Sequence, residues 1–401
     1  MPAQSKRTTR LLLLKTEQLE IMKMKITHLI LAGSILLTLH SCKDDSETPT
    51  DTKTTNTPLL PVDLTLDTVL QGLNRPWGFD FIDDNTIIFT DRDQGIFLWD
   101  GSAKTVMANT PAASTIGQGG YMDIVRHPDF DNNSLIYFSM SRNDGGGAST
   151  ALYRAKFIAP SSFGDVQLLF QAEPKNSSGA HFGSRIVFDE NGYVYLSLGE
   201  RNSMQTAQQT TNHNGSVIRI MEDGSIPDDN PFSNDAPNMP EIWTYGHRNV
   251  QGMAIHPETG EIWTHEHGPR GGDEINILQK GANYGWPLAS YGINYNGDTI
   301  TKDTFVEGTI APIYYWVPSI APCGMTFYWS DSIPQWKGDL FLGALAGQHL
   351  NHLKVGNNEV LEEERMLEGL ARFRAVRQGP DGYLYFATEN PGMIRRYKPA
   401  H

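Results

Sequence analysis

Cysteine is nearly absent from this sequence, whose 401 residues contain only Cys42 and Cys323. Cys42 directly follows an apolar segment near the N-terminus, which leaves Cys323 alone in the rest of the chain. A single cysteine cannot form an intrachain disulfide. A disulfide-stapled fold is therefore excluded, and stability has to come from packing, together with a metal ion if one binds.

Positive charge is also scarce. The chain has 32 Lys and Arg against 46 Asp and Glu, a net charge of -14 at pH 7, and it contains no long basic run. Binding to nucleic acid requires clustered Lys and Arg that neutralise phosphates, so this function is disfavoured. The nucleophile motif GxSxG is absent as well, which removes one common signature of a hydrolase.

The apolar run near the N-terminus is too short for a transmembrane helix. It covers residues 29–39, and Lys23 and Lys25 precede it, as in a signal peptide. The run ends in "LHSC", which resembles the lipidation site of a bacterial lipoprotein with Cys42 as the lipidated residue. We therefore expect residues 1–42 to be a leader and the protein to be exported, to the periplasm or the cell surface, with a lipid as its only membrane anchor. An ordinary signal peptide with an incidental cysteine is the alternative.

Two further segments complete the expected organisation. Residues 1–21 fit no part of a leader, so Met22 or Met24 is an alternative start of translation. Residues 43–61 are polar and rich in Thr, without apolar periodicity, which is typical of a disordered tether. The folded domain is expected over residues 62–401, where the apolar content is sufficient for one large core.

Helical periodicity is almost missing, and six similar strand–turn–strand units take its place. Each unit has an alternating strand, a turn rich in Asp, Asn, Pro or Gly, and a second strand. The turns lie near Asp84, Asn133, Gly192, Gly260, Gly338 and Gly382. Further strand candidates lie between the units, so each repeat has three or four strands. Six such repeats predict an all-β fold, a six-bladed β-propeller, whose ring residues 62–73 close against the last blade.

The repeat also predicts where polar side chains gather. In an antiparallel hairpin, the start of the first strand and the end of the second strand lie at the same edge. Residues 264–276 leave the end of the second strand of unit four and so reach this edge. Polar residues also stand at the start of the first strand in several units: Gln118, His181, Arg248, Asn249, Arg372 and Arg374. Equivalent positions in a ring converge, so we expect all of them around the central mouth of the propeller.

This set of side chains indicates a binding site for an anion, a binding site for a cation and a general base. Three arginines at one place favour a carboxylate, which fits the bidentate guanidinium group. The carbonyl oxygens of Gly268 and Pro269, together with Glu274, are hard donors that suit calcium. His181 is a candidate general base, because the reference pKa of histidine is about 6.5.

Five motifs make the pattern specific. They are "GQGGYMDIVRHPDF", "HFGSRIVFD", "GHRNVQGMAIHP", "EHGPRGGDEINILQKGANYGWP" and "RFRAVRQGPDGYLYFATE". Together they resemble the soluble-type pyrroloquinoline quinone-dependent aldose sugar dehydrogenases, the family of soluble glucose dehydrogenase. The resemblance implies a six-bladed propeller with pyrroloquinoline quinone and Ca²⁺ as cofactors. It also implies oxidation of an aldose at the anomeric carbon to a lactone, an external electron acceptor, and a monomer or homodimer.

The same resemblance implies a role for each matching residue. His181 matches the base that removes the proton of the anomeric hydroxyl while hydride passes to the quinone. Arg248 and Asn249 match residues that contact the quinone, and Arg248 would stabilise charge developing on its oxygen. Gln118 matches a residue lining the same site, and Tyr295 falls near another cofactor contact.

The resemblance extends to the cofactor's carboxylates and to calcium. Arg372 and Arg374 match the pair that grips the carboxylates. The implied metal positions are Gly268 and Pro269, whose carbonyls bind the cofactor's calcium, and Glu274 and Tyr284, which match a further calcium position.

Three positions depart from the family pattern. Ala180 stands before the histidine where the glucose enzyme has an aspartate, and Ala375 stands where relatives carry an aspartate. Residues 343–353 contain no Lys or Arg where relatives place a basic cofactor contact. These departures leave open a sugar-binding surface propeller without redox chemistry. A calcium-dependent propeller lactonase is the other alternative, because it also needs a metal at the axis.

Overall fold

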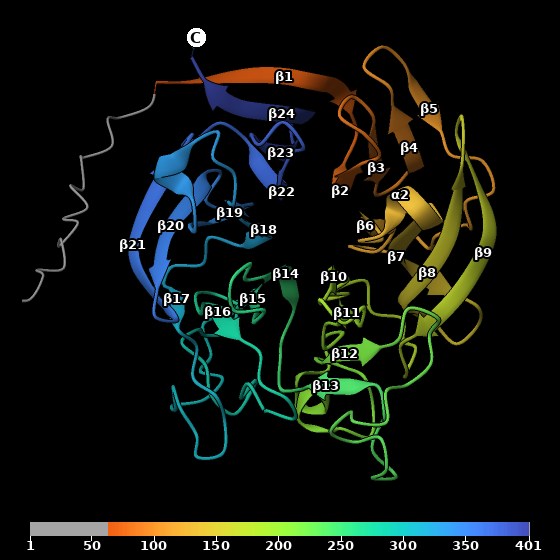
Figure 1. Cartoon of the computed structure of the whole chain (residues 1–401). Coiled ribbons are helices and arrows are strands. Elements are labelled where there is room, and N and C mark those ends of the chain that lie inside the picture. Colours follow the sequence, from red (N-terminus) through yellow and green to blue (C-terminus); the bar gives the residue numbers. More distant parts are fainter. Residues whose placement is uncertain (1–62, 401) are drawn as a thin grey trace, which may run out of the picture. The chain divides into compact units, whose positions relative to one another are not determined.

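The computed structural model describes residues 63–400, which form a six-bladed β-propeller (Figure 1). Six four-stranded antiparallel sheets surround a common axis, and the predicted fold is confirmed. The predicted leader, the lipidation of Cys42 and the tether over residues 43–61 lie outside the described residues and stay predictions. Among residues 63–400, no helix is long and apolar enough to cross a membrane.

The first strand of each blade lies next to the axis, and the later strands follow outward (Figure 1). The first three blades are β2 (Pro76–Phe81), β3 (Ile87–Asp91), β4 (Gly95–Trp99) and β5 (Lys104–Val106); β6 (Tyr121–Arg126), β7 (Leu135–Asn143), β8 (Ala148–Ile158) and β9 (Ser162–Gln171); and β10 (Ile186–Phe188), β11 (Val194–Ser197), β12 (Val217–Ile220) and β13 (Ile242–Thr244). The other three are β14 (Val250–Ile255), β15 (Ile262–Glu266), β16 (Asp273–Ile277) and β17 (Tyr314–Trp316); β18 (Pro322–Phe327), β19 (Leu340–Ala344), β20 (Leu350–Gly356) and β21 (Glu359–Met366); and β22 (Arg372–Gln378), β23 (Leu384–Glu389), β24 (Gly392–Pro399) and β1 (Leu64–Leu73).

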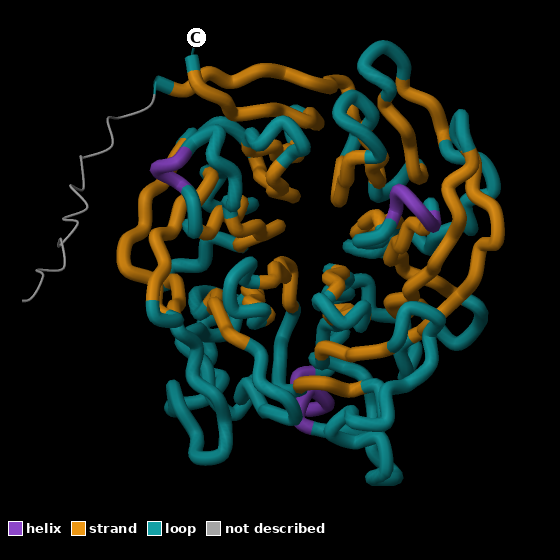
Figure 2. Tube along the Cα trace, viewed as in Figure 1, coloured by secondary structure: helices purple, strands orange, loops and turns teal. Residues whose placement is uncertain are grey.

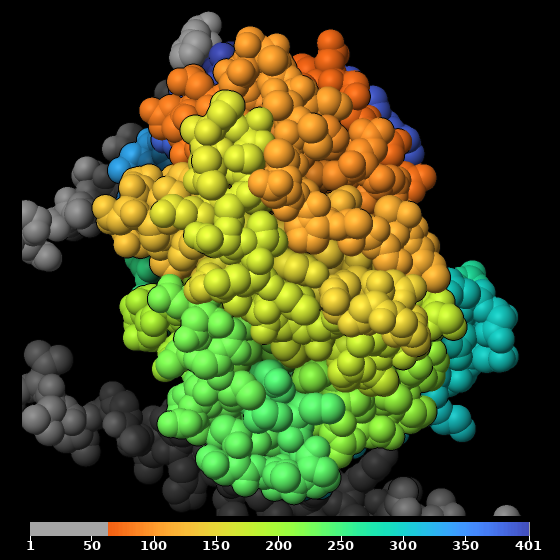
Figure 3. Space-filling view, turned by 90° about the vertical axis from the view of Figure 1, so that its right-hand side faces the viewer, coloured from red at the N-terminus to blue at the C-terminus, as the bar shows by residue number. Residues whose placement is uncertain are grey.

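Loops and short helical turns connect these strands. The longest loops belong to the third and fourth blades, at the lower edge of Figure 2. The helical turns are α2 (Phe130–Asn133), η1 (Met204–Gln208) and η2 (Pro334–Trp336). Seen from the side, the first three blades follow one another in chain order, from orange to green (Figure 3).

The predicted hairpins are the first two strands of the blades. In the third blade, β10 and β11 meet at a turn where Gly192 has a φ of 82°, a conformation that favours glycine. The Asp189 carboxylate accepts hydrogen bonds from the backbone N–H groups of Asn191 (2.9 Å) and Tyr193 (3.0 Å). The turn thus depends on aspartate for its hydrogen bonds and on glycine for its positive φ.

The N-terminal strand closes the ring. β1 pairs antiparallel with β24, the last strand of the chain, as predicted for residues 62–73. Leu70 and Leu73 of β1 join a buried cluster with Phe79 of the first blade and Ile394 of the sixth. Burying one such side chain contributes about 1.5–3 kcal/mol. The first and last blades are therefore held together by apolar packing like that between the other blades.

Candidate active site

A cavity of about 460 Å³ lies at the edge where the first strands begin and the second strands end. The structure brings four of the predicted residues together in its lining: Gln118, Asn249, Arg372 and Arg374. The aromatic rings of Trp77 and Phe182 form part of the same wall. The cavity lining therefore combines apolar side chains with amide and guanidinium groups.

His181 lies beside this cavity, in the connection that leads into β10. Its backbone N–H donates a hydrogen bond to Oε1 of Gln118 (2.9 Å), which ties it to a residue of the cavity lining. Its φ is 54°, in the left-handed region, and its carbonyl packs against Gly199, where a Cβ atom would come within 2.1 Å of the oxygen. The backbone of His181 is thus held by close contacts on two sides.

The imidazole of His181 is paired with a buried carboxylate. Nδ1 donates a hydrogen bond to Oε1 of Glu200, a residue only 2% exposed. Because an ionised carboxylate only accepts hydrogen bonds, this contact places the proton on Nδ1 and leaves the lone pair on Nε2. His181 and Glu200 together have the arrangement of a base and the group that orients it.

The surroundings keep this imidazole neutral. Burial lowers the pKa of His181 below its ordinary value of 6.5, and the charges of Arg248 and Arg201 lower it further. The hydrogen bond to Glu200 acts in the opposite direction but does not outweigh burial. A neutral histidine with a free Nε2 can accept a proton at neutral pH.

Arg201 fixes the loop that carries His181. Its guanidinium donates to the carbonyl oxygens of Ala148 (3.1 Å) and Ala180, and to Oδ1 of Asn176 (3.2 Å). It also lies 3.6 Å from the ring centroid of Phe182. Burial lowers the pKa of Arg201 to about 10, so the group remains charged at neutral pH.

Sequence reasoning missed Glu200 and Arg201, although a signal for both was present. They follow the second strand of the hairpin whose first strand begins after His181. The rule that brings the two strand ends to one edge therefore applies to them as well.

Arg248 and Asn249 connect this region to the loop after β15. The guanidinium of Arg248 donates through Nη1 to the carbonyl oxygens of His267 (3.0 Å) and Gly268 (2.9 Å). Oδ1 of Asn249 accepts from the backbone N–H of Gly183, two residues after His181 (3.1 Å). The third and fourth blades are thus joined through the residues that sequence analysis singled out.

A much smaller pocket lies behind Arg248. Its volume is about 10 Å³, and its lining includes Gly268, Glu274 and Tyr284, three of the four predicted metal positions. The hydroxyl of Tyr284 donates to the Ile277 carbonyl (2.7 Å) and accepts from the backbone N–H of Gln279 (2.8 Å), so its main-chain oxygen is the atom left to bind a cation. Pro269 follows Gly268 in the same loop but does not line the pocket.

The electrostatics of this pocket favour a cation. Burial raises the pKa of Glu274 well above its ordinary value, and the nearby carboxylate of Glu266 raises it further. Within residues 63–400, no cluster of three or more His, Cys, Asp or Glu side chains has the arrangement of a metal site. A cation here would therefore depend on main-chain oxygens together with Glu274.

Three other features singled out in the sequence add no polar side chain to the large cavity. Tyr295 is 73% exposed and lines neither pocket, so the structure does not bring it together with the other predicted residues. In the stretch without basic residues, Leu345 and Ala346 line the cavity and add no charge. Ala375 lines a different cavity.

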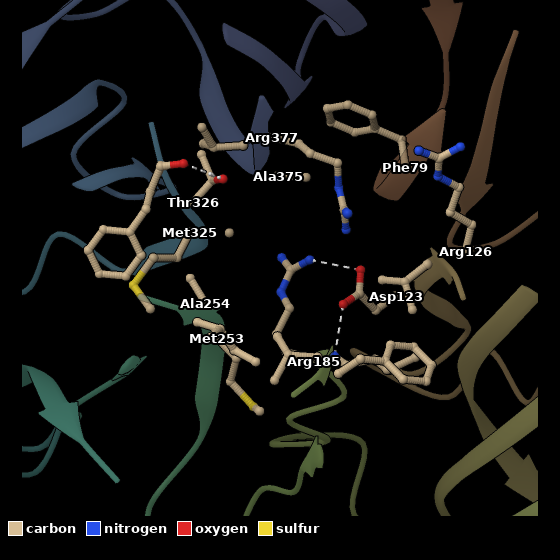
Figure 4. Close-up of a pocket in the computed structure, with 18 of the residues that line it drawn as sticks. Phe79, Asp123, Arg126, Arg185, Met253, Ala254, Met325, Thr326, Ala375 and Arg377 are labelled. Carbon is tan, nitrogen blue, oxygen red and sulfur yellow. Dashed lines mark hydrogen bonds and ion pairs between the residues drawn. The ribbon is translucent and has the colours of Figure 1, made fainter. Parts of the chain in front are cut away.

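That second cavity, of about 280 Å³, lies between the later parts of the first strands (Figure 4). Arg185 and Asp123 form an ion pair in it, with Nη1 and Oδ1 3.3 Å apart. The Arg185 guanidinium also donates to the Arg374 carbonyl (2.8 Å) and lies 4.0 Å from the ring centroid of Trp77. Arg185 therefore separates the two cavities, and no predicted site residue lines the second one.

Comparisons with known proteins agree with this geometry. Residues 73–396 match the family model described as "Glucose / Sorbosone dehydrogenase". The chain is 42% identical over 348 residues to aldose sugar dehydrogenase YliI of Escherichia coli, covering 84% of this chain and 94% of that protein. It is 33% identical over 256 residues to quinoprotein glucose dehydrogenase B of Acinetobacter calcoaceticus, covering 56% of this chain and 52% of that protein. The solved apo-form of the soluble aldose sugar dehydrogenase from Escherichia coli has a TM-score of 0.80 at 40% identity, covering 84% of this chain and all of that one.

Proposed function

The chain belongs to the glucose/sorbosone dehydrogenase family, and on that premise we propose that it oxidises aldose sugars to lactones with pyrroloquinoline quinone and calcium. The observation that carries the proposal is the neutral His181, oriented by Glu200, beside a cavity with several arginines in its lining. The names of the two similar enzymes, an aldose sugar dehydrogenase and a quinoprotein, support the same activity. Electrons would then pass to an external acceptor.

The residues present fit the quinone. Pyrroloquinoline quinone is a flat tricycle with three carboxylates, and a cavity of about 460 Å³ is in the usual range for a ligand of that size. Trp77 and Phe182 contribute apolar atoms to the lining, while Gln118 and Asn249 contribute amide groups. When bound, the quinone would supply the hydride acceptor that no side chain provides.

The side chains would act on the sugar as follows. Nε2 of His181 accepts the proton of the anomeric hydroxyl, which requires the neutral imidazole that burial favours. Glu200 keeps Nε2 directed at the substrate and stabilises the imidazolium that forms. Arg248 contributes a positive charge beside this histidine. Loss of the hydroxyl proton and of the hydrogen on the anomeric carbon converts the sugar to its lactone.

Calcium would bind in the small pocket behind Arg248. The lining offers the carbonyl of Gly268, the carboxylate of Glu274 and the main-chain oxygen of Tyr284, and Pro269 follows Gly268 outside this lining. These three groups are hard oxygen donors. A divalent cation would also offset the repulsion between Glu274 and Glu266, which no opposite charge in the pocket other than Arg248 compensates.

The experiment is a titration of the purified protein with the quinone, with and without calcium, followed by addition of glucose and other aldoses. We expect calcium-dependent binding and then reduction of the cofactor, read from its absorption spectrum. The His181→Ala variant should bind the quinone but lose at least about 100-fold in the rate of reduction. Lactone hydrolysis without quinone would instead support the lactonase, and sugar binding without quinone binding would support a sugar-binding propeller.

A further inference from the structure

Four arginines line the large cavity on the side formed by the sixth and first blades. They are Arg75, Arg92, Arg372 and Arg374. Glu389 is the only carboxylate in the same lining. In a protein whose net charge is -14, this wall is a local excess of positive charge that favours an anion.

The two arginines of the sixth blade are already engaged. Arg374 donates to Oε1 of Glu389 through Nε (2.9 Å) and Nη2 (2.7 Å), and its Nη1 contacts the Cys323 sulfur (3.4 Å). Arg372 donates to the Leu345 carbonyl (3.0 Å), and its Nε lies 3.5 Å from Oε2 of Glu389. All three nitrogens of the Arg374 guanidinium therefore have partners within the protein.

Arg92 differs from Arg374 in this respect. It follows β3, and its backbone N–H donates to the carbonyl of Arg75, which precedes β2 (2.9 Å). Its Nε bonds Oδ1 of Asp93 (3.2 Å). Among the hydrogen bonds and ion pairs within residues 63–400, none uses either of its Nη atoms. The side chain is only 11% exposed, so its position is fixed while its outer edge is open to the cavity.

Arg75 reinforces this position at the rim. Its Nη1 lies 3.2 Å from Oδ2 of Asp93, so the two arginines share one carboxylate. The side chain of Arg75 is 49% exposed, and solvent screens its charge more strongly than that of Arg92. Arg92 also helps to lower the pKa of Glu389: burial raises this pKa, but Arg374, Arg372 and Arg92 together outweigh it.

We propose that Arg92, with Arg75 at the rim, binds a carboxylate of the quinone through its open Nη edge, and that Arg374 is a positioning residue locked by Glu389. The proposal rests on the proposed function. Two parallel N–H groups match a carboxylate, and a guanidinium held in place loses little entropy on binding it. Residues 343–353 of the fifth blade contain no Lys or Arg that could contact the cofactor. On this proposal the first blade supplies the basic contact, and the sixth blade lies between the two.

The test compares the quinone with its trimethyl ester, which keeps the rings but has no carboxylate charges. Dissociation constants are measured by equilibrium titration with calcium present, so the readout does not depend on turnover. In Arg92→Gln, the affinity for the acid should fall about 10- to 100-fold, because a charge-assisted hydrogen bond is lost. The affinity for the ester should change much less. Arg75→Gln should show the same selective loss, at about 2- to 5-fold.

The comparison of acid with ester separates contact from damage to the fold. A variant whose fold is distorted loses affinity for the acid and for the ester equally. Such an equal loss in Arg92→Gln and also in Arg92→Lys would overturn the proposal. Unchanged binding of the acid by Arg92→Gln would overturn it too. Arg365→Gln, on the outer strand β21, is the matched control and should bind both forms like the unsubstituted protein. If the unsubstituted protein binds no quinone, the proposed function itself is contradicted.

Discussion

At the scale of single residues, the pairing of His181 with Glu200 gives a prediction about pH. Glu200 raises the pKa of His181, whereas burial, Arg248 and Arg201 lower it. Glu200→Gln removes the opposing influence, so the pKa should fall further and the acidic limb of the kcat profile should move to lower pH. The rate itself should fall about 10- to 100-fold, because a neutral amide no longer fixes the tautomer. Initial rates with an artificial electron acceptor, measured across pH, check both effects.

The direction of the pH shift distinguishes this role from a structural one. A carboxylate that only supports the fold would lower the rate without moving the limb, and a limb moved to higher pH would contradict the pairing. Glu190→Gln is the matched control. Glu190 is exposed in the turn between β10 and β11, so its substitution should leave the pH profile unchanged. The thermal midpoint of each variant shows whether the fold is retained.

The candidate site was predictable from the sequence wherever it depends on strand ends. Gln118, Asn249 and the arginine pair of the sixth blade meet in one cavity because hairpin geometry brings equivalent positions to one edge. The partner of each charge was not predictable. The ion pair between Arg374 and Glu389 depends on side-chain rotamers, which the periodicity of the sequence does not specify. Tyr295 lies in a long loop, where the repeat gives no position.

At the scale of strands and blades, the turns carried most of the information. Six hairpins were predictable because alternating apolar residues and turn-forming residues recur together, and a strand alone would have been ambiguous. The short outer strands carried a weaker signal: β5 has three residues, all exposed, so no alternation marks it. Blade boundaries thus follow from inner strands, whose burial constrains their sequence.

The closing strand gives a prediction at this scale. A chain that begins at residue 74 lacks β1, leaves β24 as an open edge and exposes the cluster that Leu70 and Leu73 help to form. Its thermal midpoint should be lower by about 10 °C or more than that of a chain beginning at residue 63, since several buried apolar side chains are lost. Differential scanning calorimetry of the two chains measures this. The open edge of β24 should also increase aggregation of the shorter chain. Equal midpoints would mean that β1 does not contribute to closing the ring.

At the scale of the whole molecule, charge is distributed unevenly. The chain carries a net charge of -14, yet one wall of the large cavity holds four arginines. The net charge of the chain repels an anionic cofactor and this wall attracts it, so its binding should depend on ionic strength. The small pocket has the opposite character, with Glu266 and Glu274 close to each other. The two pockets share His267 in their linings and therefore suit an anion and a cation side by side.

Binding of the cation should consequently stabilise the whole propeller. A ligand that binds only the folded state raises the unfolding free energy by about 2.7 kcal/mol at 100 times its dissociation constant. Calcium should therefore raise the thermal midpoint in a concentration-dependent way, and magnesium should do so less, because it demands stricter geometry. Glu274→Gln removes the like-charge repulsion with Glu266, so without calcium its midpoint should equal or exceed that of the unsubstituted protein. The same variant should lose the calcium-dependent increase, and an undiminished increase would place the cation elsewhere.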